Sequence, residues 1–224
     1  MLPNSIVLSR TAEVVVTATG GRRRSVNKKT GDMIQIQAAP TAVDPVTAGN
    51  SGHQKLVCFD CPIQALCYVN KGHAPLAVWQ ATKAQPPIDL SVWDSRGKPV
   101  RLGSWGDPAA MSTEVLETVT AGLHTGYTHQ WRKRSDLSEI CMASVETPAQ
   151  REEAAGMGWR TFRPIIDGQA PDTGEILCPY VSTGGKVQCS TCLLCSGRRS
   201  QAKDIVVPIH GTHKRAGKAY LQAL

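Results

Sequence analysis

Stretches rich in β-branched residues alternate with helix-like stretches along most of the chain. Near the start, residues 5–18 are rich in Ile, Val and Thr, and residues 33–38 alternate apolar and polar positions. The segment between them is rich in glycine and basic residues, so we predict a β-ribbon with a polar, basic tip. Residues 39–54 are dominated by Ala, Pro, Thr and Gly without periodicity, which predicts a linker or a loop over the main domain.

Beyond residue 54 the spacing of apolar residues first becomes helical and then alternates. Residues 62–83 predict a helix that Gly72 and Pro75 divide into two pieces. Apolar runs then predict strands at 99–103, 126–131, 138–145, 159–165 and 204–210.

Two helices have recognisable starting residues. Ser112 is a good cap for a helix through about Ala121, and Thr147 followed by Pro148 opens a helix that runs to Gly156. The alternation of strands and helices predicts an α/β fold with an open, mainly parallel sheet or a partial (β/α) barrel. We therefore expect an N-terminal ribbon and linker over residues 1–54 and an α/β domain over residues 55–224.

Seven of the eight cysteines fall into two groups with the spacing of metal ligands. The first cysteine group is Cys58, Cys61 and Cys67, and the second is Cys178, Cys189, Cys192 and Cys195. Thiolates separated by two residues can bind one soft metal or one iron-sulfur cluster, so we predict two inorganic centres. Cys141 stands apart in an apolar stretch and is interpreted as a small core residue.

The two groups differ in how many ligands they supply. Four thiolates close a tetrahedral zinc site or a 4Fe-4S cluster, so we expect the second group to form a structural, cysteine-rich metal loop. Three thiolates leave one iron of a 4Fe-4S cluster open to a small molecule, unless a histidine such as His53 or His73 is the fourth ligand. The chain starts without an apolar signal segment, which favours the cytoplasm and reduced thiols.

Polar residues stand where the predicted strands end. In parallel sheets ligands gather at the carboxyl ends of the strands, and Gly103, Gly106 and Asp107 lie at one such end. Glycine lets the backbone approach a ligand, and Asp107 can accept a hydrogen bond from an amine. An ordinary strand-to-helix turn explains the same residues.

The order of these features resembles a pared-down radical S-adenosylmethionine (SAM) enzyme: a cysteine loop ending in Cys67 and Tyr68, a helix, then a strand followed by Gly106, Asp107 and Pro108. Residues 101–110, 126–131, 141–145 and 158–164 more closely resemble phage- and plasmid-borne proteins of unassigned function, over about residues 55–212. A phage-encoded protein would act in the host cytoplasm.

The radical SAM resemblance implies roles for individual residues. Cys58, Cys61 and Cys67 would ligate a 4Fe-4S cluster whose open iron chelates SAM, and the second cysteine group would hold an auxiliary cluster. Gly106, Asp107 and Pro108 would form the loop that binds the SAM amino group, and Ser144 and Glu146 would contact its ribose or carboxylate. The family's cysteines are separated by three and then two residues, whereas here the separations are two and then five.

The net charge of +7 adds a second hypothesis about function. Basic residues cluster at Arg22, Arg23, Arg24, Lys28 and Lys29, at Arg132, Lys133 and Arg134, and at Arg198, Arg199, Lys203, Lys214, Arg215 and Lys218. Such clusters suit nucleic acid, although solvated loops explain them equally. No Walker-type loop or Ser-His-Asp triad is recognisable, and no apolar run approaches the roughly 20 residues of a membrane span. The hypotheses are thus a radical SAM-like enzyme acting on a nucleotide-related or nucleic-acid substrate, and a metal-stabilised, non-enzymatic nucleic-acid-binding or regulatory protein.

Overall fold

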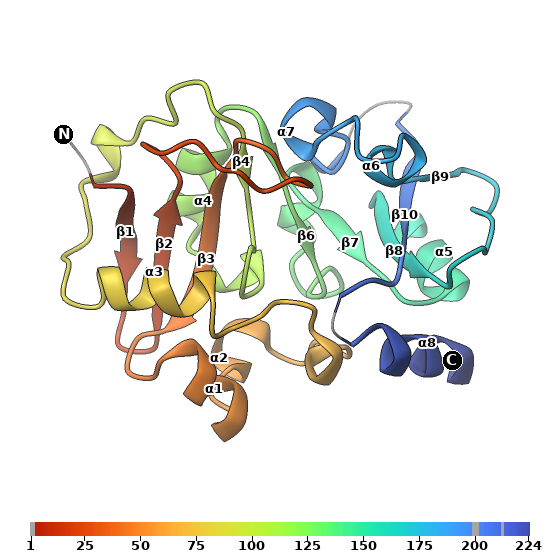
Figure 1. Ribbon diagram of the computed structural model, residues 1–224, viewed down its shortest axis with the longest axis horizontal. Coiled ribbons are helices and arrows are strands. Elements are labelled where there is room, and N and C mark those ends of the chain that lie inside the picture. Colours follow the sequence, from red (N-terminus) through yellow and green to blue (C-terminus); the bar gives the residue numbers. More distant parts are fainter. Residues whose placement is uncertain (1–2, 199–201, 212) are drawn as a thin grey trace.

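The computed structural model describes residues 3–198, 202–211 and 213–224, and its ten strands form two five-stranded sheets (Figure 1). The first sheet has the order β1-β2-β3-β4-β5, and its strands are Ser5–Arg10, Val14–Thr19, Ile34–Pro40, Val100–Arg101 and His124–Thr125. The second has the order β6-β7-β8-β10-β9, with β6 at Tyr127–Thr128, β7 at Met142–Ser144, β8 at Thr161–Ile165, β9 at Glu175–Leu177 and β10 at Asp204–Pro208. The first sheet is mixed, since β1, β2 and β3 are antiparallel, whereas every pairing in the second sheet is parallel.

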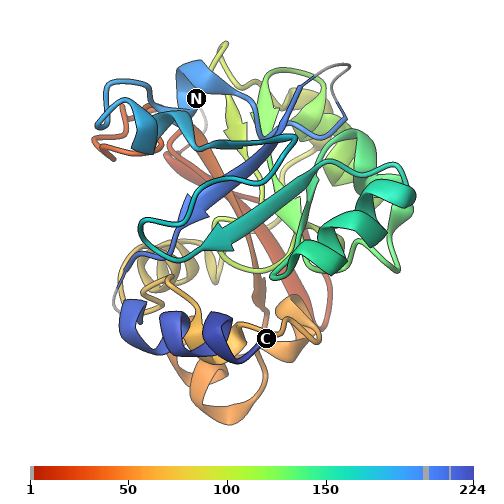
Figure 2. The ribbon, with the colours of Figure 1, turned by 90° about the vertical axis from the view of Figure 1, so that its right-hand side faces the viewer.

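The two sheets meet at Gly126, which alone separates β5 from β6. The peptide hydrogen bonds continue across this point, because Leu102 N–H donates to Thr125 O on one side and Met142 N–H donates to Gly126 O on the other. A Cβ atom at Gly126 would lie 2.9 Å from Cys141 Sγ, so glycine is required by the close approach. The result is an open arrangement with no closed barrel, and Figure 2 shows the strands of the two sheets in crossing directions.

Helices and short 3₁₀ turns connect the strands. The α-helices are α1 Pro45–Ser51, α2 Lys55–Cys58, α3 Ala74–Thr82, α4 Thr113–Thr120, α5 Pro148–Gly156, α6 Pro179–Ser182, α7 Cys189–Cys192 and α8 Lys214–Ala223. The 3₁₀ turns are η1 Gln64–Leu66, η2 Leu90–Val92, η3 Pro108–Ala110 and η4 Ser135–Glu139. Ser112 and Thr147 cap α4 and α5 as predicted, each accepting a hydrogen bond from the backbone N–H three residues later.

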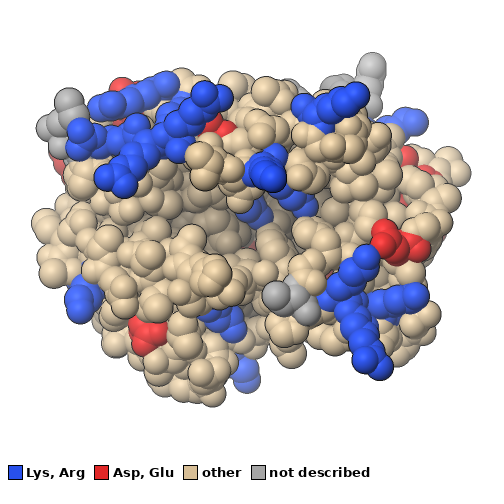
Figure 3. Space-filling model, viewed as in Figure 1, with Lys and Arg blue, Asp and Glu red and all other residues tan. Residues whose placement is uncertain are grey.

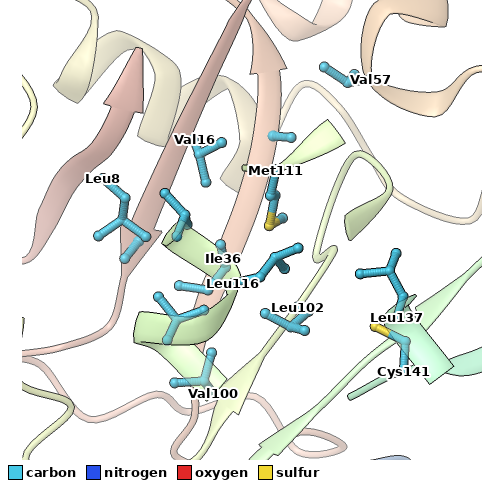
Figure 4. Packing of buried hydrophobic residues seen from close by; sticks show 14 of the residues in the cluster. Leu8, Val16, Ile36, Val57, Val100, Leu102, Met111, Leu116, Leu137 and Cys141 are labelled. Atoms are coloured by element: carbon cyan, nitrogen blue, oxygen red, sulfur yellow. The ribbon is translucent and has the colours of Figure 1, made fainter. Parts of the chain in front are cut away.

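The first sheet is covered on both faces, and successive residues of its strands point to opposite faces. Leu8, Val16 and Ile36 face α4 and form the main hydrophobic core with Val100 and other residues (Figure 4). Val7 and Val15 point the other way, toward α1 and α3. Cys141 is fully buried in the main core, which confirms its interpretation as a core residue.

Several predictions about the fold need correction. The α/β class and the parallel sheet are confirmed. The N-terminal strands β1, β2 and β3, however, belong to the first five-stranded sheet, which they join through the parallel pair β3–β4, and so are not a separate ribbon. The expected linker at 39–54 contains α1, whose first turn is capped by Asp44. The Ala-, Pro-, Thr- and Gly-rich composition led to the prediction of a linker, although Asp44 followed by Pro45 is typical of a helix start. No helix in the described part of the chain is long and apolar enough to cross a membrane.

Candidate functional site

A cavity with a volume of about 340 Å³ lies on the face of the sheets that carries α3 and α8 (Figure 1). Figure 3, which shows this face, has a hollow near its centre. All seven cysteines of the two groups line this cavity: Cys58, Cys61, Cys67, Cys178, Cys189, Cys192 and Cys195. Residues of α8 close part of it, including Tyr220 and Leu221. Two segments that are more than 100 residues apart in the chain therefore bring their thiols to one space.

The first cysteine group lies at the carboxyl ends of parallel strands, where the sequence predicted a ligand site. Helix α2 packs against β3 and η3, and its Val57 is fully buried. Asp107 N–H, just after β4, donates a 2.7 Å hydrogen bond to Val57 O. Cys61 Sγ lies 3.6 Å from Nδ1 of His129, which follows β6. The loop that carries these thiols is thus fixed to the hydrophobic core.

His129 connects the first cysteine group to Glu146. Its Nε2 lies 3.2 Å from a Glu146 oxygen, and both side chains are largely buried. Burial alone would lower the pKa of His129, but its interactions with Cys61 and Glu146 outweigh burial and raise it to about 10. The protonated ring therefore places a positive charge between the Cys61 sulfur and the Glu146 carboxylate. His53 and His73, the two histidines considered as a fourth ligand, are both exposed, and His53 is bonded to Ser51.

Burial makes two free thiols of the first group, Cys58 and Cys67, hard to ionise. Burial, and then the neighbouring Cys61 and Cys67, raise the pKa of Cys58 to about 12. Burial likewise raises the pKa of Cys67. Thiolates in such surroundings need a nearby positive charge, which a bound metal centre provides.

In the second cysteine group, Cys178 follows β9, whereas Cys189, Cys192 and Cys195 lie near the amino ends of other strands. Lys29 and Thr30, ahead of β3, accept hydrogen bonds of 3.0 and 2.9 Å from the first two N–H groups of α7. Gly126 N–H donates to Cys195 O, and the buried Arg160, just before β8, donates to the carbonyls of Leu194, Gly197 and Lys203. The loop is therefore held by hydrogen bonds, three of which come from the Arg160 guanidinium group.

The thiols of the second group also influence one another. Burial, and then Cys178, Cys189 and Cys192, raise the pKa of Cys195 to about 12. All eight cysteines are free thiols in the structure. Within the described part of the chain, however, no three His, Cys, Asp or Glu side chains are close enough together to bind one metal ion. The thiols of each group are neighbours without forming a mononuclear site.

Asp107, which the sequence placed in a ligand-binding loop, has its carboxylate occupied by the protein itself. Its oxygens accept hydrogen bonds from Ala109 N–H, from the Thr128 hydroxyl and from His129 N–H. These bonds tie the turn after β4 to the end of β6, and Asp107 is buried. Its visible role is to position His129 and the loop.

The other predicted ligand residues divide into those that line the cavity and those that do not. Gly103, Gly106 and Ser144 line it, whereas Pro108 and Glu146 are not part of the lining. Gly103 and Gly106 both have positive φ angles, of 63° and 75°, and a side chain at Gly106 would collide with Ala38 of β3. The structure thus explains both glycines by backbone geometry.

The basic clusters differ in how far acids neutralise them. Arg132, Lys133 and Arg134 each form an ion pair, with Glu153, Asp60 and Asp136 respectively. Arg198 and Lys214 are paired as well, and Arg199 lies outside the described residues. By contrast, Arg22, Arg23 and Arg24 are exposed and form no ion pair in the described part of the chain, although Arg24 is close enough to help lower the pKa of Asp32. This N-terminal tip is the better candidate for an exposed anion-binding surface.

The comparisons with known proteins add no name to this site. No protein family model, no curated protein and no solved structure matches the chain.

Proposed function

We propose that this chain is an iron-sulfur protein with a radical SAM-like core, in which the cavity between the two cysteine groups is the reaction chamber. The observation that carries the proposal is the convergence of seven thiols, from two distant segments, on one cavity. A structural cysteine loop needs no shared cavity, whereas a cluster with an open iron needs space beside it for a ligand. The volume of about 340 Å³ lies within the usual range for small-molecule sites.

The choice of clusters over single zinc ions rests on the number of thiols and their positions in the sequence. Three thiolates are the protein ligands of a four-iron cluster with one open iron, whereas a structural zinc site takes four ligands. The thiols of each group also raise one another's pKa, as Cys61 and Cys67 do for Cys58, and a bound centre would relieve this.

Cys58, Cys61 and Cys67 would hold the cluster with the open iron, and the second cysteine group would hold a closed cluster. When bound, a reduced cluster of the first kind supplies an electron to SAM. Ser144 and the backbone at Gly103 and Gly106 line the space beside it and are the candidates for SAM contacts. Asp107 and Glu146 support this wall indirectly, through His129.

The alternative is a non-enzymatic protein whose metal centres are structural and stabilise a nucleic-acid-binding or regulatory surface. The exposed Arg22, Arg23 and Arg24, which form no ion pair in the described structure, favour this function. Under this alternative the cavity has no ligand, and either zinc or closed clusters would serve.

The test is metal and sulfide analysis of protein purified without oxygen. We expect a brown protein with iron and acid-labile sulfide in equal amounts, and about half of the iron in Cys58→Ser or Cys192→Ser. Cys141→Ala is the matched control, because Cys141 is buried in the hydrophobic core away from both groups, and it should keep the full iron content. Zinc without sulfide, or the same iron content in all variants, would contradict the proposal.

A further inference from the structure

A positively charged site lies in the cavity between the two cysteine groups, centred on Arg101. The Arg101 Nη2 atom donates hydrogen bonds of 2.6 Å to the Tyr68 hydroxyl and 3.0 Å to the Tyr127 hydroxyl, and the two hydroxyls are 2.8 Å apart. All three side chains line the cavity. No acidic side chain in the described part of the chain pairs with Arg101, in contrast to Arg163, which binds Glu175 and Asp172. An arginine is always charged, so Arg101 holds a positive charge in the cavity without a protein counterion.

Lys29 supplies a second positive charge to the same cavity. Its Nζ lies 3.1 Å from His210 Nε2, while His210 Nδ1 lies 3.0 Å from the Pro208 carbonyl oxygen. The carbonyl can only accept, so Nδ1 carries the proton and Nε2 accepts from the ammonium group. Burial and the nearby Lys29 lower the pKa of His210, which agrees with a neutral ring. Lys29 therefore keeps two of its three N–H donors for a ligand.

The carboxylates of the cavity do little to neutralise these cations. Among the described residues Asp107 is the one acidic side chain in the lining, and its oxygens already accept three hydrogen bonds. Around Arg101 the wall is aromatic: Tyr127 stacks on Phe162 with ring centroids 4.7 Å apart, and Tyr68 lies 5.7 Å from the ring of His210. Several donors around a guanidinium match the oxygens of a phosphate, and aromatic faces suit a base.

We propose that Arg101 and Lys29 bind the phosphate of a nucleotide, with Tyr68 and Tyr127 contributing their hydroxyls. The phosphate site itself does not require a cluster. Only the further statement that the nucleotide is the substrate rests on the proposed function. Two other roles for the cations make different predictions. If they only offset the charge of the clusters, no anion binds, and if they hold an amino-acid carboxylate, methionine binds and pyrophosphate does not.

The experiment is calorimetric titration of the full chain, purified anaerobically with its metal, with pyrophosphate, adenosine 5′-monophosphate and methionine. We expect pyrophosphate and the nucleotide to bind and Lys29→Gln to weaken both about 10-fold, as expected for a charge-assisted hydrogen bond. Lys28→Gln is the matched control, because this exposed neighbour in the same loop does not line the cavity, and it should change binding less than about 2-fold. Arg101→Gln should abolish binding and Arg101→Lys should restore part of it.

A 5′-phosphorylated oligonucleotide separates two sources of the phosphate. Stronger binding of the mononucleotide identifies a small-molecule substrate, and stronger binding of the oligonucleotide, still dependent on Lys29, identifies the end of a nucleic acid. The proposal is overturned if neither pyrophosphate nor the nucleotide binds at millimolar concentration, if only methionine binds, or if Lys28→Gln and Lys29→Gln have equal effects. Iron and sulfide are measured on the same samples: iron-free protein that binds pyrophosphate refutes the proposed function alone, and iron-loaded protein that does not bind it refutes the phosphate site alone.

Discussion

The two cysteine groups line the same cavity but are supported by different parts of the fold. The first group begins at the last residue of α2, where Val57 is fully buried and Cys58 packs against the main hydrophobic core, although no residue of 58–67 is itself fully buried. The second group has Cys178 at the carboxyl end of β9 and its other thiols near the amino ends of strands, and between Cys178 and Arg198 only Gly197 is fully buried. The first loop is thus attached to the core at its start, whereas the second depends on hydrogen bonds and on whatever its thiols bind.

This difference implies different dependence on metal. A loop with little apolar burial gains its order from the centre that it ligates, because metal binding and folding are then one process. A loop that is fixed to a core can lose its metal and keep its conformation, so its centre can be open and reactive. The four predictions below test this contrast.

The largest effect is expected from Cys192→Ser. Removing one of four thiolates should release the second centre, lower the melting temperature by about 10 °C and expose residues 178–198 to protease, because about 3–5 kcal/mol of stabilisation lost from a chain of this size has that effect. Ser190→Ala in the same helix is the control and should behave like the wild type. A Cys192→Ser protein with full metal content and an unchanged melting temperature would show that the second loop orders itself.

The next effect concerns the buried ion pair that holds β9, the strand leading into Cys178. Burial alone would raise the pKa of Glu175, but its bonds to Arg163 outweigh burial and lower it below the ordinary value of 4.5. Its stabilising contribution is therefore complete above that value and is lost as the pH falls through the lowered pKa. Glu175→Gln should cost about 3 kcal/mol at pH 7, since it leaves Arg163 buried with a weaker partner.

Thermal unfolding at several pH values checks this. The difference in melting temperature between wild type and Glu175→Gln should be largest at neutral pH and shrink below the ordinary pKa of glutamate. A difference that does not vary with pH would mean that the pair contributes packing and not charge. The exposed pair Arg132–Glu153 provides the control, because Glu153→Gln should leave stability unchanged.

A smaller effect on stability is expected from Cys58→Ser. The first centre should be lost, while the fold loses only about 1–2 kcal/mol because Val57 and α2 stay packed in the core. Hydrogen exchange of residues 178–198 should not change. Loss of protection there would show that the two groups depend on each other and that the contrast is wrong.

The smallest effect is expected from His129→Gln. Hydrogen bonds to cluster sulfurs raise reduction potentials, so removal of the contact with Cys61 should make the potential of the first cluster about 40 mV more negative, the equivalent of roughly 1 kcal/mol for one electron. The potential of the second cluster should stay constant. Loss of iron from this variant would instead make His129 a ligand.

Features that act over a few residues, such as helix caps, predicted the structure well. The caps Ser112 and Thr147 determine where α4 and α5 begin, because each acts on backbone groups within three residues. The parallel strands followed from apolar runs, although β5 and β9 are too short and too irregular to leave such a run. The linker expected at 39–54 was wrong because low periodicity was weighted above the cap at Asp44.

The cavity could be predicted only in part. Cysteine spacing identified both groups, but nothing local indicated that they share one cavity. Arg101 meets Tyr68 and Tyr127 only through the fold, at sequence separations of 33 and 26 residues. Likewise, the position of Asp107 after a strand suggested a ligand-binding residue. Only the folded structure shows that its carboxylate oxygens accept hydrogen bonds from Thr128 and His129.

The most direct test of the contrast between an open first centre and a closed second one is electron paramagnetic resonance of the reduced, anaerobically purified protein with and without SAM. Under this account two cluster signals are expected, and SAM should change only the one that is lost in Cys58→Ser, because only that cluster would have an iron free of protein ligands. Spectra that are identical with and without SAM, or a SAM-sensitive signal that survives in Cys58→Ser and disappears in Cys192→Ser, would contradict the account.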